Sequence, residues 1–141
     1  MPAAAAAAAL FGWLVPGGAY LLLRRYAQFA LFLLLVSSAC AAGTALQGAN
    51  QWPQPAELQG LDGATTIMAQ AGALAKLLAG GPYLLARLLD GNHTFLTGRL
   101  HEYGTTLLTL AGLLNLLALA DAMQLRTAAL RKAMPREVNQ P

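Results

Sequence analysis

Residues 17–24 read Gly17-Gly18-Ala19-Tyr20-Leu21-Leu22-Leu23-Arg24, and residues 80–87 read Gly80-Gly81-Pro82-Tyr83-Leu84-Leu85-Ala86-Arg87. Six of the eight positions are identical at a constant offset of 63 residues, and each copy follows one apolar run and precedes another. A self-match at one fixed offset is typical of a repeated structural unit. It predicts two related helical hairpins of the same orientation, the alternative being a chance match in a chain rich in Leu and Ala.

The composition is that of a membrane protein. Of the 141 residues, 57% are hydrophobic and 11% charged, whereas soluble domains carry roughly 25% charged residues. Segments 26–46 and 103–120 contain no charge and have about the length that crosses a hydrocarbon core. A buried helix of a soluble bundle would keep a polar stripe, and residues 29–36 have none. We therefore expect an all-α integral membrane protein.

Four transmembrane helices are expected, at about 3–23, 26–47, 64–89 and 103–124. The first helix of each hairpin should be broken, at Pro16-Gly17-Gly18 and at Gly80-Gly81-Pro82, because Pro removes a backbone N–H and Gly loosens the chain. The expected organisation is a first hairpin over 1–47, a polar loop over 48–63, a second hairpin over 64–124 and a basic tail over 125–141. The N-terminal stretch lacks the basic region of a signal peptide, so we expect it to be a retained first helix.

The net charge of +3 comes mainly from Arg and Lys at segment ends, where lipid headgroups lie. Arg24, Arg25 and Arg87 each follow the repeated phrase, so we expect them at one membrane surface, against lipid or a partner. Trp52 in the long loop suits the membrane interface. The basic residues divide almost evenly between the two faces, and the arginines beside the first helix favour cytoplasmic corners with both termini outside. Nothing resembles the basic and aromatic platform of a nucleic-acid-binding protein.

Two stretches of the chain resemble known families. Trp13-Leu14-Val15-Pro16-Gly17-Gly18-Ala19-Tyr20, followed by Arg24-Arg25, resembles the hairpin of the two-transmembrane-domain pattern. Gly81–Leu88, and especially Glu102-Tyr103-Gly104 running into Ala111–Leu117 and Asp121-Ala122, resemble domain of unknown function 6677, a family of small bacterial membrane proteins. The resemblance covers about 10–124 and implies a protein of the bacterial cytoplasmic membrane. It implies no reaction, since the family has no assigned activity.

The candidate residues for helix packing are Gly17, Gly18, Gly80, Gly81 and Asn115. Glycines let helices approach closely, and an amide in the middle of a span can form a hydrogen bond with another helix. Asn115 shares one helical face with small residues, namely Ala111, Ala118 and Ala122. We expect it to stabilise packing rather than to act on a substrate.

Lys76 is the one full charge well inside a predicted span, which makes it a candidate for a transport role. Its long stem could instead reach the membrane surface or a local partner, and this structural interpretation is the favoured one. Pairing with Asp121 is not expected, because the two residues should differ in depth by more than about 10 Å.

The remaining polar residues do not suggest an enzyme. His93 and His101 lie eight residues apart without metal-ligand spacing, so they are weak candidates, at most for ligation of a haem or pigment. Cys40 has no partner for an internal disulfide and reads as a small buried thiol. The sequence predicts no catalytic residue, no metal site and no resident cofactor.

Two functions remain open at this point. The first is a structural or accessory subunit that packs against other membrane subunits or a second copy, supported by the faces of small residues. The alternative is a small transporter or channel, because broken helices mark the binding site in many transporters. Each break lies within about five to eight residues of a basic corner, which places both breaks near one membrane face and favours the first function.

Overall fold

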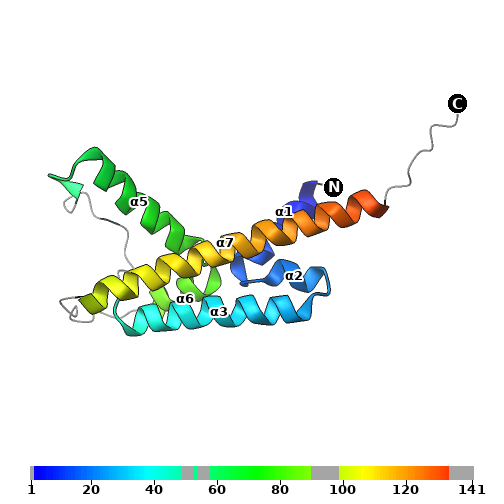
Figure 1. The fold of residues 1–141 in the computed structure, drawn as a ribbon, viewed down its shortest axis with the longest axis horizontal. Coiled ribbons are helices and arrows are strands. Elements are labelled where there is room, and N and C mark those ends of the chain that lie inside the picture. Colours follow the sequence, from blue (N-terminus) through cyan, green and yellow to red (C-terminus); the bar gives the residue numbers. More distant parts are fainter. Residues whose placement is uncertain (1, 49–52, 54–57, 90–98, 134–141) are drawn as a thin grey trace, which may run out of the picture.

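The computed structural model of the chain describes residues 2–48, 53, 58–89 and 99–133. The helices are Pro2–Leu14 (α1), Gly18–Leu22 (α2), Tyr26–Ala45 (α3), Gly63–Leu77 (α5), Gly81–Leu89 (α6) and Arg99–Ala133 (α7). α3 and α7 lie side by side, and the shorter helices pack around them (Figure 1). The predicted all-helical fold is confirmed for the residues described.

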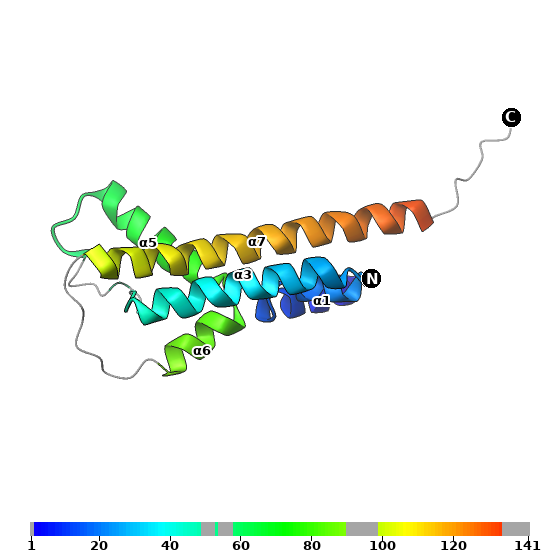
Figure 2. The same ribbon diagram turned by 60° about the horizontal axis from the view of Figure 1, so that its bottom comes forward.

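The long helices α3 and α7 run in opposite directions (Figures 1 and 2). At one end, Nδ1 of His101 donates a hydrogen bond to the carbonyl of Gln47, which ties the start of α7 to the end of α3. At the other end, Leu23 before α3 lines the same hollow as Arg126 of α7. Gly43 permits a close approach, since a Cβ there would lie 2.9 Å from the carbonyl oxygen of Gly104.

The first helix break reverses the chain. α1 begins at Pro2, where a missing N–H costs nothing, and ends at Leu14, just ahead of Pro16. Gly17 then adopts a left-handed conformation with φ of 73°, which glycine tolerates without strain. α2 folds back along α1, so that a Cβ on Gly12 would lie 2.9 Å from the Ala19 Cβ.

The second break also reverses the chain, and the helix that leads to it arrives from the opposite end of the molecule. α5 begins after Asp62, whose carboxylate accepts a hydrogen bond from the Thr65 hydroxyl that lowers the pKa of Asp62. The helix ends at Leu77, and Gly80 takes a left-handed φ of 70°. α6 then leaves toward the end of the molecule from which α5 arrived (Figures 1 and 2). Both broken helices therefore point inward and turn back.

Small residues bring α5 and α7 into backbone contact. A Cβ on Gly112 of α7 would lie 1.6 Å from the carbonyl oxygen of Ala75 in α5. Two buried clusters flank this contact along α7. One joins α3, α6 and α7 and includes Val36, Cys40, Tyr83, Leu108 and Ala111. The other joins α2 and α7 and includes Ala19, Tyr20, Ala118 and Ala122.

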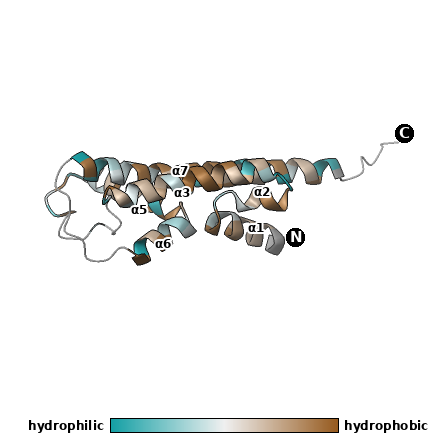
Figure 3. Ribbon diagram, turned by 90° about the horizontal axis from the view of Figure 1, so that it is seen from below, coloured by the Kyte–Doolittle hydropathy of each residue, from teal (hydrophilic) through white to brown (hydrophobic). Residues whose placement is uncertain are grey.

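The expectation of four transmembrane helices is wrong. Two helices are long and apolar enough to cross a membrane, α3 with 20 residues and α7 over Arg99–Lys132 with 34. Figure 3 shows that the apolar residues of α7 concentrate in its middle and the hydrophilic ones toward its ends. The segments 3–23 and 64–89 form no single helix of that length, because each reverses at its break instead of kinking. α7 also continues beyond 124, through the first half of the predicted tail.

The predicted common orientation of the two hairpins is wrong as well. Since α3 and α7 are antiparallel, the turn between α2 and α3 lies at one end of the molecule, whereas α6 runs toward the other (Figures 1 and 2). Arg24 and Arg25 belong to that turn and Arg87 belongs to α6. Tyr20 and Tyr83 are not interfacial, because their exposed fractions are 1% and 3%. The repeated phrase does not show in which direction each hairpin runs. That direction depends on whether the chain kinks or reverses at each break.

Replacing Gly112 by Ala should destabilise the fold by about 1–3 kcal/mol, because the added Cβ overlaps the Ala75 carbonyl and backbone must move. Gly72→Ala in α5 is the matched control, since a Cβ there meets nothing within 4 Å. That change should leave stability unchanged or raise it by up to about 1 kcal/mol through helix propensity. Thermal unfolding of both variants in detergent measures the difference. Equal melting temperatures would contradict the close contact of α5 and α7.

Candidate functional site

The two helix breaks meet each other against the middle of α7. A Cβ on Gly80 would lie 1.8 Å from the carbonyl oxygen of Trp13, and one on Gly81 would lie 2.4 Å from that of Leu14. The last turn of α1 thus rests directly on the backbone at the start of α6. Any side chain beyond hydrogen at positions 80 and 81 would force the breaks apart.

Three hydrogen bonds join the ends of α1 and α5 at this meeting point. The indole Nε1 of Trp13 donates to the carbonyl of Leu77 at 3.0 Å. The amide Nδ2 of Asn115 donates to the carbonyls of Trp13 at 3.0 Å and of Leu78 at 2.8 Å. Carbonyls in the last turn of a helix have no partner within the helix. Asn115 therefore satisfies two carbonyls that would be costly to leave unpaired in an apolar setting, whereas the Leu77 carbonyl also accepts a hydrogen bond from the backbone N–H of Gly80.

The orientation of the Asn115 amide follows from these contacts. Two carbonyl oxygens can only accept, so the nitrogen has to face them and the oxygen has to face away. The side chain is 1% exposed, and its Oδ1 has no hydrogen-bond partner within the described structure. Asn115 thus donates two hydrogen bonds, one to each helix end, and its Oδ1 accepts none within the described structure.

A fourth polar contact lies two turns further along α7. The Tyr20 hydroxyl donates to Oδ2 of Asp121 at 2.6 Å, and the Tyr20 ring stacks on Phe32 with centroids 5.5 Å apart. This contact fixes α2 between α3 and α7. It also gives the carboxylate of Asp121 a donor where the uncharged stretch of α7 ends.

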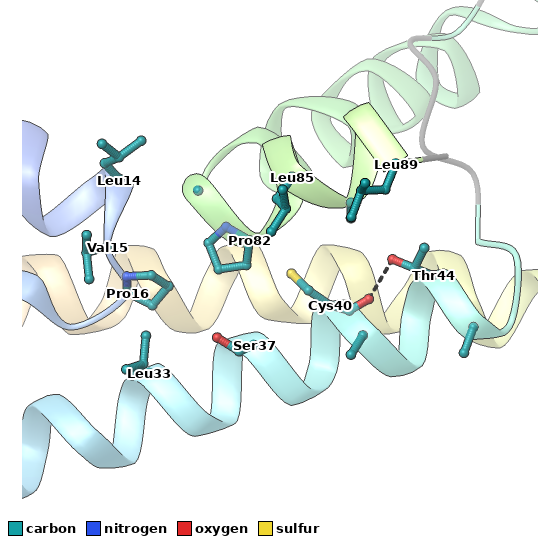
Figure 4. A pocket seen from close by; sticks show the side chains of 14 residues that line it. Leu14, Val15, Pro16, Leu33, Ser37, Cys40, Thr44, Pro82, Leu85 and Leu89 are labelled. Atoms are coloured by element: carbon teal, nitrogen blue, oxygen red, sulfur yellow. Dashed lines mark hydrogen bonds between the residues drawn. The ribbon is translucent and has the colours of Figure 1, made fainter. Parts of the chain in front are cut away.

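An apolar groove of about 640 Å³ runs beside the meeting point, between α3 and α6 (Figure 4). Ser37, Cys40 and Ala41 form its α3 wall, Pro82 and Leu85 form its α6 wall, and Pro16 of the first break closes one end. The Thr44 hydroxyl donates to the carbonyl of Cys40 at 2.7 Å and so remains satisfied within its own helix. The groove therefore offers packing surface and few polar groups.

The structure brings together only some of the residues singled out from the sequence. Gly80, Gly81 and Asn115 lie at the meeting point, whereas Gly17 approaches Phe29 of α3 and Gly18 approaches Phe11 of α1. Lys76 is 6% exposed, so its side chain is buried rather than extended to the surface.

The two histidines do not come together as a site. His101 is bound to the Gln47 carbonyl, while His93 and Trp52 fall outside the described residues. Among the described ranges no group of three His, Cys, Asp or Glu side chains could hold a metal ion.

Sequence reasoning missed Trp13, Gly112 and the pair of Tyr20 and Asp121. Trp13 stands in an apolar run, and its bond to the carbonyl of Leu77, 64 residues away, has no local signal. Gly112 directly follows Ala111, which belongs to the small-residue face of α7. This position was the signal in the sequence that Gly112 could lie at a helix contact. Tyr20 and Asp121 are 101 residues apart in the chain, and no local pattern links them.

Asn115→Leu should lower the free energy of unfolding by about 1–3 kcal/mol, because two helix-end carbonyls lose their donor. Asn115→Asp keeps the shape and replaces the donor with an acceptor, so it should destabilise at least as much. Chemical unfolding in detergent gives both values. An aspartate variant as stable as the original chain would contradict the role of Asn115 as a double donor.

Comparison with curated proteins and with solved structures gives no match. The model of one protein family, a family of unknown function, matches residues 7–133, which include both helix breaks and all of α7. The chain therefore belongs to DUF6677, a family of unknown function.

Proposed function

We propose that the protein is an integral protein of a bacterial cytoplasmic membrane, crossed by α3 and α7. The uncharged stretch of α7 from 103 to 120 and the 20 residues of α3 each match a hydrocarbon core of about 30 Å. Gly112 lies at the centre of that stretch, and Asn115 lies one turn further along. The two breaks would then enter from opposite membrane surfaces and meet at mid-depth.

The order of elements supports an internal repeat of inverted topology. α1, α2 and α3 form a series of entering helix, returning helix and long helix, and α5, α6 and α7 repeat this series in the opposite direction. Inverted repeats with broken helices are common among membrane proteins. The repeated Gly-Gly-x-Tyr-Leu-Leu phrase falls at the same place in both series, which favours duplication over chance.

The distribution of charge favours both termini in the cytoplasm. Basic residues gather at the end that holds the start of α3 and the end of α7, namely Arg24, Arg25, Arg126, Arg131 and Lys132. The opposite end carries Arg87 and Arg99 together with Asp62 and Glu102. The positive-inside rule assigns the first end to the cytoplasm. The earlier preference for external termini depended on grouping Arg87 with Arg24 and Arg25.

We infer that the protein is a structural or accessory subunit without chemistry of its own. The observation that carries this proposal is the closed backbone contact of Gly80, Gly81 and Gly112 with α1 and α5, which leaves no room for a solute along the meeting point. The groove between α3 and α6 suits a transmembrane helix of a neighbouring subunit, because Ser37, Ala41 and Ala86 permit close approach.

A small transporter is the second candidate, favoured by one observation. Broken helices that meet at mid-depth are where many transporters bind substrate, and the structure removes the objection that both breaks lie near one face. Lys76 is buried one turn before the second break and would supply a charge there if the contact opened. Solute flux through liposomes that is lost in Lys76→Met would favour this candidate.

The orientation can be measured by cysteine labelling in a Cys40→Ser background, since Cys40 is the chain's only cysteine. Arg25→Cys and Arg131→Cys should react with a membrane-impermeant maleimide only from the cytoplasmic side, and Glu102→Cys only from the outside. Labelling of positions 25 and 102 from the same side would contradict the opposed arrangement of the broken helices. Labelling of position 25 from the outside would show that the membrane orientation is opposite to the proposed one.

The accessory role predicts that one face of α3 holds a partner. Ala41→Trp fills the groove and should abolish stoichiometric co-purification in mild detergent, while Ala30→Trp, an exposed position of the same helix outside the groove, should retain it. The mass of the complex tells a second copy from another subunit. A lone species in both variants and in the original chain would contradict the accessory role.

A further inference from the structure

A second hollow, of about 550 Å³, lies at the basic end of the molecule between α1, α2 and α7. Alanines from all three helices are among the residues that line this hollow, namely Ala7, Ala8, Ala19 and Ala122. Their small side chains leave space between the helices that larger residues would fill. Among the residues that line this hollow, Arg126 alone is charged, and its side chain is half-buried.

The surroundings of the hollow are strongly basic. Leu23 on its wall is followed by Arg24 and Arg25 in the turn before α3, and Arg131 and Lys132 follow on α7. An apolar hollow with a guanidinium at its wall and further cations around it is complementary to a ligand with a hydrocarbon part and an anionic head.

We propose that this hollow binds one anionic phospholipid, with its glycerol end and the first carbons of a chain among the alanines and its phosphate on Arg126. The guanidinium offers paired N–H donors to phosphate, which an ammonium group does not. The inference rests on the proposed membrane insertion and orientation, because the anionic headgroups of the cytoplasmic leaflet lie at this end. A lipid held there would join α1 to α7 where α1 has few other polar contacts.

The test is thermal unfolding and native mass spectrometry of the full chain in detergent with phosphatidylglycerol or phosphatidylcholine. We expect phosphatidylglycerol to raise the melting temperature more and to remain bound in the mass spectrum. Arg126→Gln should weaken its binding about fivefold, the effect of one cationic contact with an anionic headgroup. Arg131→Gln, on another face of the same helical end, is the matched control and should change binding less than twofold.

Two further arms separate the hollow from general charge attraction. Ala7→Leu fills the hollow without changing charge and should reduce lipid binding, while Ala6→Leu, exposed and outside the hollow, should not. Inorganic phosphate at the same concentration should have no effect, since it has no hydrocarbon part. Equal binding of both lipids, or equal losses in the Arg126 and Arg131 variants, would overturn the proposal. Cysteine labelling tests membrane insertion separately, so correct labelling with no lipid preference would overturn this site alone.

Discussion

The hydrogen bonds from Asn115 to the carbonyls of Trp13 and Leu78 are the interaction on which the rest of the structure depends. A helix that stops inside an apolar medium leaves carbonyls without partners, and each would cost several kcal/mol if exposed to hydrocarbon. Here two helices stop at the same place, and one amide on a third helix serves both. Gly80, Gly81 and Gly112 make this possible, because they let the backbones approach within reach of a single side chain.

That constraint determines the remaining architecture. α1 and α5 both end beside Asn115 after arriving from opposite ends of α7, and α2 and α6 return to those ends. α3 then fits between the two returning helices and runs antiparallel to α7. The basic residues collect at one end as a result, and this asymmetry supports the proposed orientation and the proposed lipid site together.

The sequence was sufficient for the helical class and the places of both breaks, because composition, Pro and Gly act locally. It could not predict the reversal at each break, since Pro16 and Gly17 allow either a kink or a full turn and only the contact with Gly80 decides. That one difference changed the number of helices long enough to cross a membrane, the surroundings of Tyr20 and the end of the molecule toward which α6, with Arg87, runs. The bond of Tyr20 with Asp121 depends on the reversal too, so it was out of reach of local patterns.

The most direct test of opposed broken helices is a distance between spin labels on Arg24→Cys and Arg87→Cys, in a Cys40→Ser background and in lipid. Arg24 precedes α3, and α6 reaches the end of α3, because Leu89 and Ala45 line the same groove. The 20 residues of α3 should therefore separate the two labels by about 30 Å. Spin coupling at short range detects distances of about half that value or less. A distance in that range would put both corners at one membrane surface. It would contradict the meeting of the two breaks inside the membrane.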